Sequence, residues 1–285
     1  MEQVPVVVQR AFNVYIDDSP QSASEALSEA WDGGVRVGDL VVSRVADVER
    51  ANWSAKTRET IVPSGVRLAR PIRSTDGRFI VSGWRVNEYS PGEIHARADE
   101  VVAAAVRLGE AMAALPVPHF ASREVATSAT DTDLFDLADR AAWSDNPSRL
   151  LAVGLTQDTE ATALQQVALE NAAQIVQRCH DVPGAPHVCH ADMFATTVTS
   201  GGATPVVTDL VCVAHPTAYT AAMAMVDAMI AGVANADILE RFSFLRDIEQ
   251  LVFRALLYRL YLHALHPHAN SNNSARLTGI VRQLL

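Results

Sequence analysis

Lysine is almost absent from this chain: Lys56 is the only one among 23 basic residues, and the rest are arginines. Acidic residues number 33, so the formal net charge at pH 7 is −10. Proteins that bind nucleic acids or membrane surfaces gather positive charge in clusters, and this sequence contains no basic cluster. We therefore expect neither nucleic acid nor membrane among its partners.

Cysteine and long hydrophobic runs are scarce as well. Three cysteines in 285 residues are too few for a disulfide framework. No apolar run approaches the roughly 20 residues that a membrane-spanning helix needs. The first residues, Met1-Glu2-Gln3, lack the basic start of a signal peptide. Together these absences predict a cytoplasmic protein.

The composition is that of a globular protein, with 49% hydrophobic and 20% charged residues. Residues 1–90 predict a small α+β lobe that ends at the Pro91-Gly92 breaker. The stretch 22–31 is open between a helix and an irregular segment. The other elements predicted here are a strand over 4–14, a hairpin of 35–37 and 40–42 turned at Gly38-Asp39, a helix capped by Asp47 and running to about Glu59, and strands within 66–70 and 79–86 turned at Asp76-Gly77.

Residues 91–285 are predicted to form a larger, mainly helical lobe. In 96–115, for example, Val101, Ala105, Leu108 and Met112 recur at helical spacing. Further helices are predicted over 131–143, 159–179, 216–234 and 237–266, with a last short helix after the polar turn at 270–273.

Two carboxylates frame the part of the sequence that carries a chemical motif. Asp192 lies in His190-Ala191-Asp192, and Asp209 ends the apolar run 206–208, with a Ser200-Gly201-Gly202 turn between them. A hairpin at this turn would bring both carboxylates to one site. Such a pair suits phosphoryl transfer, in which one carboxylate accepts the proton of the acceptor hydroxyl and the other holds Mg²⁺.

This motif resembles the catalytic segment of the aminoglycoside phosphotransferase family, which shares the protein-kinase-like fold with choline and homoserine kinases. The runs 38–44, 67–71 and 76–78, together with Trp53 and Gly83-Trp84, resemble an uncharacterised bacterial family of the same fold. The resemblance implies a bilobal α+β architecture, with a β-rich N-lobe over 1–90 and a helical C-lobe over 91–285.

The resemblance also implies site residues and cofactors. Asp192 would be the catalytic base on a loop braced by His190. Asp209 and Thr197 would be metal ligands. Nucleotide-binding contacts would come from Glu88 and Tyr89. An active member would use ATP and Mg²⁺.

The chain departs from the family pattern at the groups that neutralise phosphate. Thr197 stands where the family has a metal-binding Asn, and Ser43 stands where it has the phosphate-binding Lys. In place of a glycine-rich turn, residues 30–34 contain Trp31 and Asp32, and Asp32 would repel phosphate. Arg44 should point away from Ser43, because neighbouring side chains on a strand face opposite ways.

Lys56 and a group of cysteines and histidines leave two alternatives open. Lys56, on the predicted helix, is either a relocated phosphate-binding and nucleotide-binding cation or an ordinary exposed lysine. A zinc site is the second alternative, because Cys and neutral His are good zinc ligands, although the spacings match no standard zinc pattern and buried thiols are common. The residues concerned are Cys179, His180, His187, Cys189, His190 and Asp192, with Cys212 and His215 nearby.

Three functional hypotheses follow. We favour a degenerate phosphotransferase-like protein, a pseudokinase with weak or no ATP phosphotransfer that acts as a ligand sensor or binding module. The alternative is an active ATP- and Mg²⁺-dependent kinase that phosphorylates a hydroxyl of a small molecule, with Asp192 as base. The third is a scaffold whose cleft is filled by side chains such as Trp31. The expected partners are a nucleotide and a small molecule, for which the acidic chain favours a cationic amine or alcohol, and a protein partner is also considered.

Overall fold

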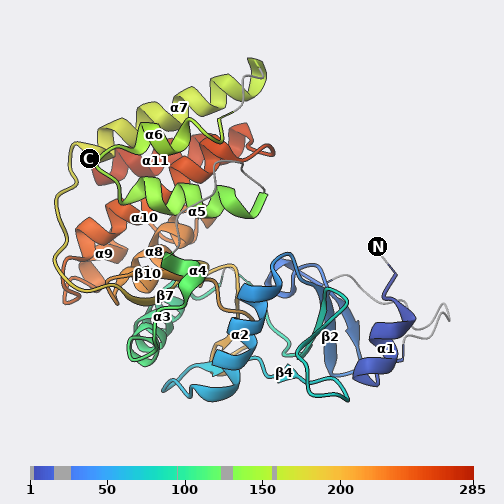
Figure 1. Cartoon of the computed structure of the whole chain (residues 1–285). Coiled ribbons are helices and arrows are strands. Elements are labelled where there is room, and N and C mark those ends of the chain that lie inside the picture. The colour runs from blue at the N-terminus through green and yellow to red at the C-terminus, as the bar shows by residue number, and fades with distance from the viewer. Residues whose placement is uncertain (1–2, 16–26, 95, 123–130, 156–158) are drawn as a thin grey trace.

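The computed structural model describes residues 3–15, 27–94, 96–122, 131–155 and 159–285. It has two lobes, a β-sheet lobe from the N-terminal part of the chain and a larger helical lobe from the C-terminal part (Figure 1). The predicted bilobal α+β fold is therefore confirmed.

The N-terminal sheet has β2 (Leu40–Arg44) and β6 (Trp84–Glu88) at its centre. The hairpin predicted at Gly38-Asp39 joins β1 (Val35–Val37) to β2, and Gly38 takes the positive φ of 62° that this turn requires. Strands β4 (Pro71–Ile72) and β5 (Ile80–Val81) both pair with β6, and every pairing in this sheet is antiparallel. The register places Ser43 of β2 opposite Arg85 of β6.

Helix α2 (Val48–Thr60) is capped as predicted, because the Asp47 carboxylate accepts a hydrogen bond from the Arg50 backbone N–H. It lies against the sheet lobe (Figure 1). Side chains four residues apart share one face of a helix, and α2 turns Ser54 and Arg58 inward while Lys56 stays exposed.

The strand predicted over 4–14 is wrong: this segment contains the helix α1 (Val6–Phe12). Val4, Val8 and Phe12 are buried at a spacing of four residues and pack on Val42 and Trp84 of the sheet. The β-branched residues favour a strand, but packing of this helical stripe overrides that weak local preference. Of the stretch 22–31, residues 22–26 lie outside the described residues, and the rest ends in the short 3₁₀ turn η2 (Glu29–Trp31).

The helical lobe contains helices in all the ranges predicted from the sequence, but the last one is longer than the predicted short helix and begins inside the polar turn predicted at 270–273. The long helices are α3 (Ala98–Met112), α5 (Asp131–Ala142), α7 (Thr159–Val176), α8 (Tyr219–Ala231), α10 (Ile248–Leu265) and α11 (Ser271–Leu284), with short helices α4 (His119–Ser122), α6 (Pro147–Leu151) and α9 (Ile238–Arg241). The helix predicted over 237–266 is divided into α9 and α10, because Asp247 takes a left-handed conformation with φ of 55° that interrupts a continuous helix.

Two small sheets carry the motif residues. Strand β7 (His187–His190) pairs with β10 (Cys212–His215), and β8 (Thr197–Val198) pairs with β9 (Val206–Val207), so the hairpin predicted at Ser200-Gly201-Gly202 is present. Strand β3 (Arg67–Leu68) does not join the N-terminal sheet. It pairs in parallel with β9 and so connects the two lobes.

Candidate functional site

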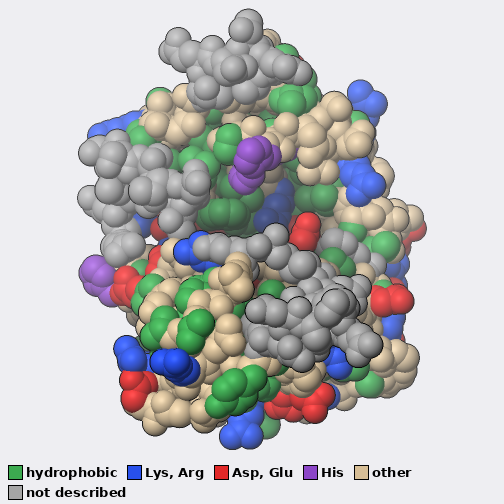
Figure 2. All heavy atoms as spheres, turned by 90° about the vertical axis from the view of Figure 1, so that its right-hand side faces the viewer, with side chains coloured by type: hydrophobic (Ala, Val, Ile, Leu, Met, Phe, Trp, Pro, Cys, Tyr) green, Lys and Arg blue, Asp and Glu red, His purple; other side chains and the backbone are tan. Residues whose placement is uncertain are grey.

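The structure brings the two motif carboxylates to one cavity. Asp192 follows β7 and Asp209 follows β9, and both line a cavity of about 330 Å³, here called the Asp209 cavity. A second cavity, of about 530 Å³, shares Asp192 and Arg259 with the first and is here called the Asp227 cavity. Figure 2 shows a hollow in the middle of one face of the molecule, with histidine, basic and acidic side chains around it, and the Asp227 cavity has the same mixture of lining groups.

His190 braces the loop that presents Asp192. The Val211 N–H donates to Nδ1 of His190 at 2.9 Å, so Nε2 carries the proton and donates to Thr196 Oγ1 at 2.8 Å. The Thr196 hydroxyl in turn donates to the Asp192 carbonyl oxygen at 2.7 Å. His190 is fully buried, and burial lowers its pKa, which keeps the ring neutral near pH 7. The bracing implied by the resemblance is thus visible in the hydrogen bonds.

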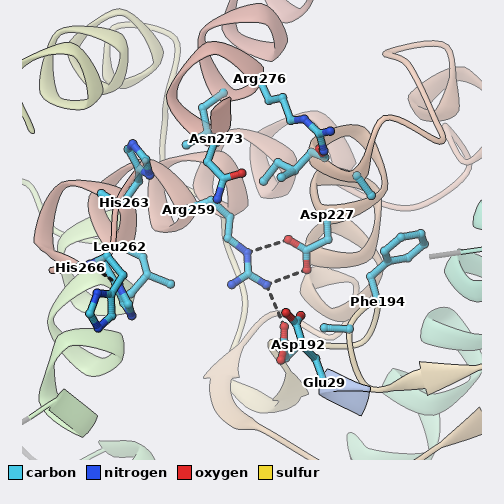
Figure 3. Close-up of a pocket in the computed structure, with 16 residues that line it drawn as sticks. Glu29, Asp192, Phe194, Asp227, Arg259, Leu262, His263, His266, Asn273 and Arg276 are labelled. Atoms are coloured by element: carbon cyan, nitrogen blue, oxygen red, sulfur yellow. Dashed lines mark hydrogen bonds and ion pairs between the residues drawn. The ribbon is translucent and has the colours of Figure 1, made fainter. Parts of the chain in front are cut away.

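Asp192 is the more accessible of the two carboxylates, with 35% of its side chain exposed. Arg259 of α10 donates to its Oδ1 at 3.1 Å. The same guanidinium holds Asp227 of α8 at 2.6 and 2.7 Å, so it lies between the two acids (Figure 3). Glu29 of η2 lies on the same side of Arg259 as Asp192 in this view.

Asp209 is enclosed by positive charge. Its Oδ1 accepts a hydrogen bond from the Ser54 hydroxyl, and its Oδ2 accepts one from Arg85 Nη1 at 2.8 Å. Arg58 Nη2 lies 3.7 Å from Oδ1. Burial alone would raise the pKa of Asp209, but the charges of Arg85 and then Arg58 lower it to about 2. Asp209 is therefore ionised and already paired.

Thr197 does not reach Asp209 as a metal ligand would. Its side chain is buried, its hydroxyl donates to the Met193 carbonyl at 2.6 Å, and it lines neither cavity. A threonine hydroxyl can satisfy itself on the backbone one turn earlier, which the longer side chain of Asn does less readily. The structure therefore gives Thr197 a structural bond where a metal ligand was predicted.

The neighbouring strand of the sheet places a cation, Arg85, beside Ser43. Arg85 stands opposite Ser43 in the sheet, its Nε lies 3.3 Å from Ser43 Oγ, and it lines the Asp209 cavity. Lys56 is exposed and lines neither cavity, as expected for the alternative of an ordinary exposed lysine and not for that of a relocated phosphate-binding cation. The reason is helix geometry, because Lys56 is two residues from Ser54 and so faces away from the inward face of α2.

Trp31 occupies the space between the two lobes. Only 4% of this residue is exposed. The Ala30 carbonyl accepts a hydrogen bond from the Thr208 hydroxyl, which ties this turn to the helical lobe. Trp31 packs in one hydrophobic cluster whose buried members come from both lobes: Ala30, Val41, Ala69, Val198 and Val206.

Glu88 and Tyr89, predicted to contact a nucleotide, line neither cavity. Glu88 is exposed. The Tyr89 ring lies 5.6 Å from the Trp31 ring, and the Arg36 guanidinium lies 4.1 Å over its face. Tyr89 is therefore partly buried and contacts both Trp31 and Arg36, and its role in nucleotide binding stays a prediction.

The predicted zinc alternative does not form a site within the described ranges, where no group of three or more His, Cys, Asp or Glu side chains could hold a metal. Cys189 and Cys212 are buried, and burial raises the pKa of each to about 12. His215 is bound to Asp139 at 2.8 Å and stacks on Trp143. The described helices also include none that is both long and apolar enough to cross a membrane.

Comparison with known proteins finds no matching family model and no matching curated protein. Among solved structures, an amicoumacin kinase in complex with AMP-PNP, Ca²⁺ and Ami matches with a TM-score of 0.55 and 14% identity, over 98% of this chain and 92% of that chain. A microcompartment-associated aminopropanol kinase matches with a TM-score of 0.50 and 16% identity, over 98% of this chain and 94% of that chain. A thermostable mutant of aminoglycoside phosphotransferase APH(4)-Ia matches with a TM-score of 0.48 and 14% identity, over 87% and 89%. The chain thus shares its overall fold with the amicoumacin kinase and the aminopropanol kinase.

Proposed function

We propose that this protein is a pseudokinase that binds a small molecule and transfers phosphoryl groups from Mg²⁺·ATP weakly or not at all. The observation that carries the proposal is the pairing of Asp209. A carboxylate that holds Mg²⁺ directs its oxygens at the metal, whereas both oxygens of Asp209 are directed at donors of the protein: Oδ1 at Ser54 and Oδ2 at Arg85.

Electrostatics opposes a metal at the same place. Two unit charges 4 Å apart repel by about 4 kcal/mol in surroundings of intermediate polarity. A divalent ion at Asp209 would be repelled by the guanidinium groups of both Arg85 and Arg58, and its double charge makes each repulsion about twice as large at the same distance. Phosphoryl transfer depends on such metal ions to neutralise the developing charge, so the arrangement supports slow or absent transfer.

The filled space between the lobes points the same way. Trp31 is buried among residues of both lobes, and Thr208 and Arg85 hold the turn that carries it. A nucleotide base that entered between the lobes would have to displace a buried indole, which typically costs several kcal/mol of packing energy.

The Asp227 cavity is the candidate ligand site. Its volume of about 530 Å³ lies in the range of small-molecule pockets. Asp192 and Glu29 contribute negative charge to its wall, which favours a ligand that carries a cationic amine. An apolar surface for the rest of such a ligand is supplied by Phe194, Ile230, Ala231, Leu262 and Leu277.

A thermal-shift titration tests both parts of the proposal. Because a ligand stabilises the native state in proportion to RT ln(1 + [L]/Kd), even weak binding is visible. Wild type is expected to show no Mg²⁺-dependent stabilisation by millimolar ATP. A panel of small amines and amino alcohols is expected to contain compounds that stabilise wild type and stabilise Asp192→Asn less.

An active kinase is the second candidate, and one observation favours it. Asp192 is partly exposed, opens onto both cavities and is held by the His190 network, as a general base would be. Stabilisation of wild type by ATP that requires Mg²⁺, together with phosphate transfer that Asp192→Asn abolishes, would overturn the pseudokinase proposal in its favour.

A further inference from the structure

Three arginines that line the Asp209 cavity each lie between two aspartates. In the first group Arg50 pairs with Asp47 and Asp136. In the second, Arg259 pairs with Asp192 and Asp227. The third is Arg85, which pairs with Asp209 on one side and with Asp32 on the other. Only 8% of the Arg85 side chain is exposed, so these two acids neutralise a charge that has little contact with water.

Asp32 differs from the other aspartates in how it is held. It follows the η2 turn in a left-handed conformation with φ of 52°, which is unusual for a residue with a side chain. About half of its side chain, 48%, is exposed, against 19% for Asp209. Asp32 is therefore the partner of Arg85 that can leave without unpacking the core.

The turn that carries Asp32 lies close against the sheet. A Cβ at Gly34 would meet Ser43 Cβ and Val41 Cγ1 at 2.9 Å, so only glycine permits this approach. Thr208 holds the Ala30 carbonyl from the other lobe. These contacts place the Asp32 carboxylate directly on the guanidinium that lies beside Ser43.

A second arginine beside Asp209, Arg58, has a nitrogen without a hydrogen-bond partner among the described residues. Only 5% of Arg58 is exposed, and its Nη2 has no hydrogen-bond partner within the part of the chain that the structure describes. Its other contacts are to Ser54 Oγ, the Ala69 and Thr208 carbonyls and Asn87 Oδ1. Arg58 and Arg85 carry two positive charges against Asp209 and Asp32, and without Asp32 the group would have one positive charge in excess.

We propose that Arg85, backed by the charge of Arg58, forms an oxyanion site that Asp32 fills from within the chain. The ligand class is a phosphate-type oxyanion, either free pyrophosphate or the phosphate tail of a nucleotide, bound without Mg²⁺. Guanidinium groups bind phosphate and carboxylate oxygens with the same geometry, so Asp32 is a tethered competitor for such a ligand. The inference rests on the proposed function in one respect: the resting cleft does not accept Mg²⁺·ATP.

Two substitutions at Asp32 separate charge from bulk. Asp32→Asn removes the charge and keeps a residue that tolerates the left-handed conformation, and Asp32→Gly removes the whole side chain in a conformation that glycine adopts freely. Asp39→Asn is the matched control, because Asp39 is an exposed acid in the β1–β2 turn and the change in net charge is the same. All variants are made in the full chain, and circular dichroism confirms that each is folded.

Pyrophosphate binding is measured by calorimetry at low salt without Mg²⁺. Both Asp32 variants are expected to bind pyrophosphate about tenfold more tightly than wild type, equal to about 1.4 kcal/mol, and Asp39→Asn is expected to match wild type. The double variant Asp32→Asn/Arg85→Gln, which keeps Asp209 paired with Arg58, should lose the gain. ADP distinguishes the two sources: tighter binding than pyrophosphate assigns the site to a nucleotide, and equal binding assigns it to free polyphosphate.

Two results would overturn the inference: folded Asp32 variants that bind pyrophosphate no better than wild type, or an equal gain in Asp39→Asn, which would reflect net charge alone. Neither result concerns the proposed function, which fails instead if wild type transfers phosphate from Mg²⁺·ATP.

Discussion

The two carboxylates of the cleft, Asp192 and Asp209, differ in exposure and in the number of groups that bind them. Asp209 is half-buried, accepts a hydrogen bond on each oxygen and lies between two arginines. Asp192 keeps a single arginine contact, remains partly exposed and opens onto a second cavity. The family resemblance assigns the first position to metal and nucleotide and the second to the acceptor. If the proposed function holds, the difference teaches that these two functions can be separated, with one end closed by internal ion pairs while the other stays open.

The largest loss of stability is expected from replacing Arg58, which lies beside Asp209. Arg58→Met removes a buried charge that pairs with Asp209 and satisfies the carbonyls of Ala69 and Thr208. Arg85 still pairs with Asp209, but the Ala69 and Thr208 carbonyls and Asn87 Oδ1 lose their buried donor, and at about 1–3 kcal/mol for each unsatisfied group the expected loss of unfolding free energy is about 3–5 kcal/mol. Urea denaturation measures the loss. Lys56→Met, on the exposed face of the same helix, should change stability by about 0.5 kcal/mol or less, and equal losses in both variants would contradict the ion-pair cluster.

Removing Trp31 tests whether the space between the lobes is filled. Trp31→Ala should lower the unfolding free energy by about 3 kcal/mol, because it leaves a cavity among the buried residues of both lobes. The same urea experiment gives the value. A loss below about 1 kcal/mol would mean that the indole is not tightly packed between the two lobes.

The pH dependence of stability sharpens the view of Asp209. Its pKa in the folded protein is about 2, below the ordinary value of 3.8, so its pairing stabilises the fold above about pH 4 and this contribution is lost as the pH falls toward 2. A shift of this size corresponds to about 2 kcal/mol. Urea midpoints between pH 6 and pH 3 in wild type and Asp209→Asn measure it, since other carboxylates titrate in both proteins and cancel in the difference. An unchanged difference across this range would refute the prediction.

The smallest effect is expected at the open end. Asp192→Asn should lower the unfolding free energy by about 1 kcal/mol or less, because Asp192 is partly exposed and Arg259 keeps its bidentate contact with Asp227. The urea experiment again supplies the number. A loss as large as that of Arg58→Met would mean that the two ends are equally closed.

The sequence predicted correctly those caps and turns whose conformation depends on residues close together in the chain. The cap at Asp47 and the turns at Gly38-Asp39 and Ser200-Gly201-Gly202 depend on local backbone conformation, and the structure contains them. The segment around α1 was predicted wrongly because its valines favour a strand locally, whereas its burial on the sheet depends on residues far along the chain.

The site residues that were missed depend on strand register. Arg85 lies beside Ser43 because β6 pairs with β2 in this register, which brings together residues 42 positions apart in the sequence. One signal was available in the sequence: Ser54 and Arg58 lie four residues apart on a predicted helix, which places a hydroxyl and a cation on one face. Lys56 between them had to point elsewhere.

The pairing of β3 with β9 has a mechanical consequence. Backbone bonds from Arg67 to Pro205 and from Ala69 to Val207 join the lobes away from the covalent connection between them, and β3 runs parallel to β9. A rigid-body rotation that opened the cleft would have to break this ladder together with the bond from Arg58 to the Thr208 carbonyl. These bonds oppose such a rotation, so the ligand proposed for the Asp227 cavity would bind without domain opening. A preformed site of this kind binds its ligand with little free-energy cost for conformational change.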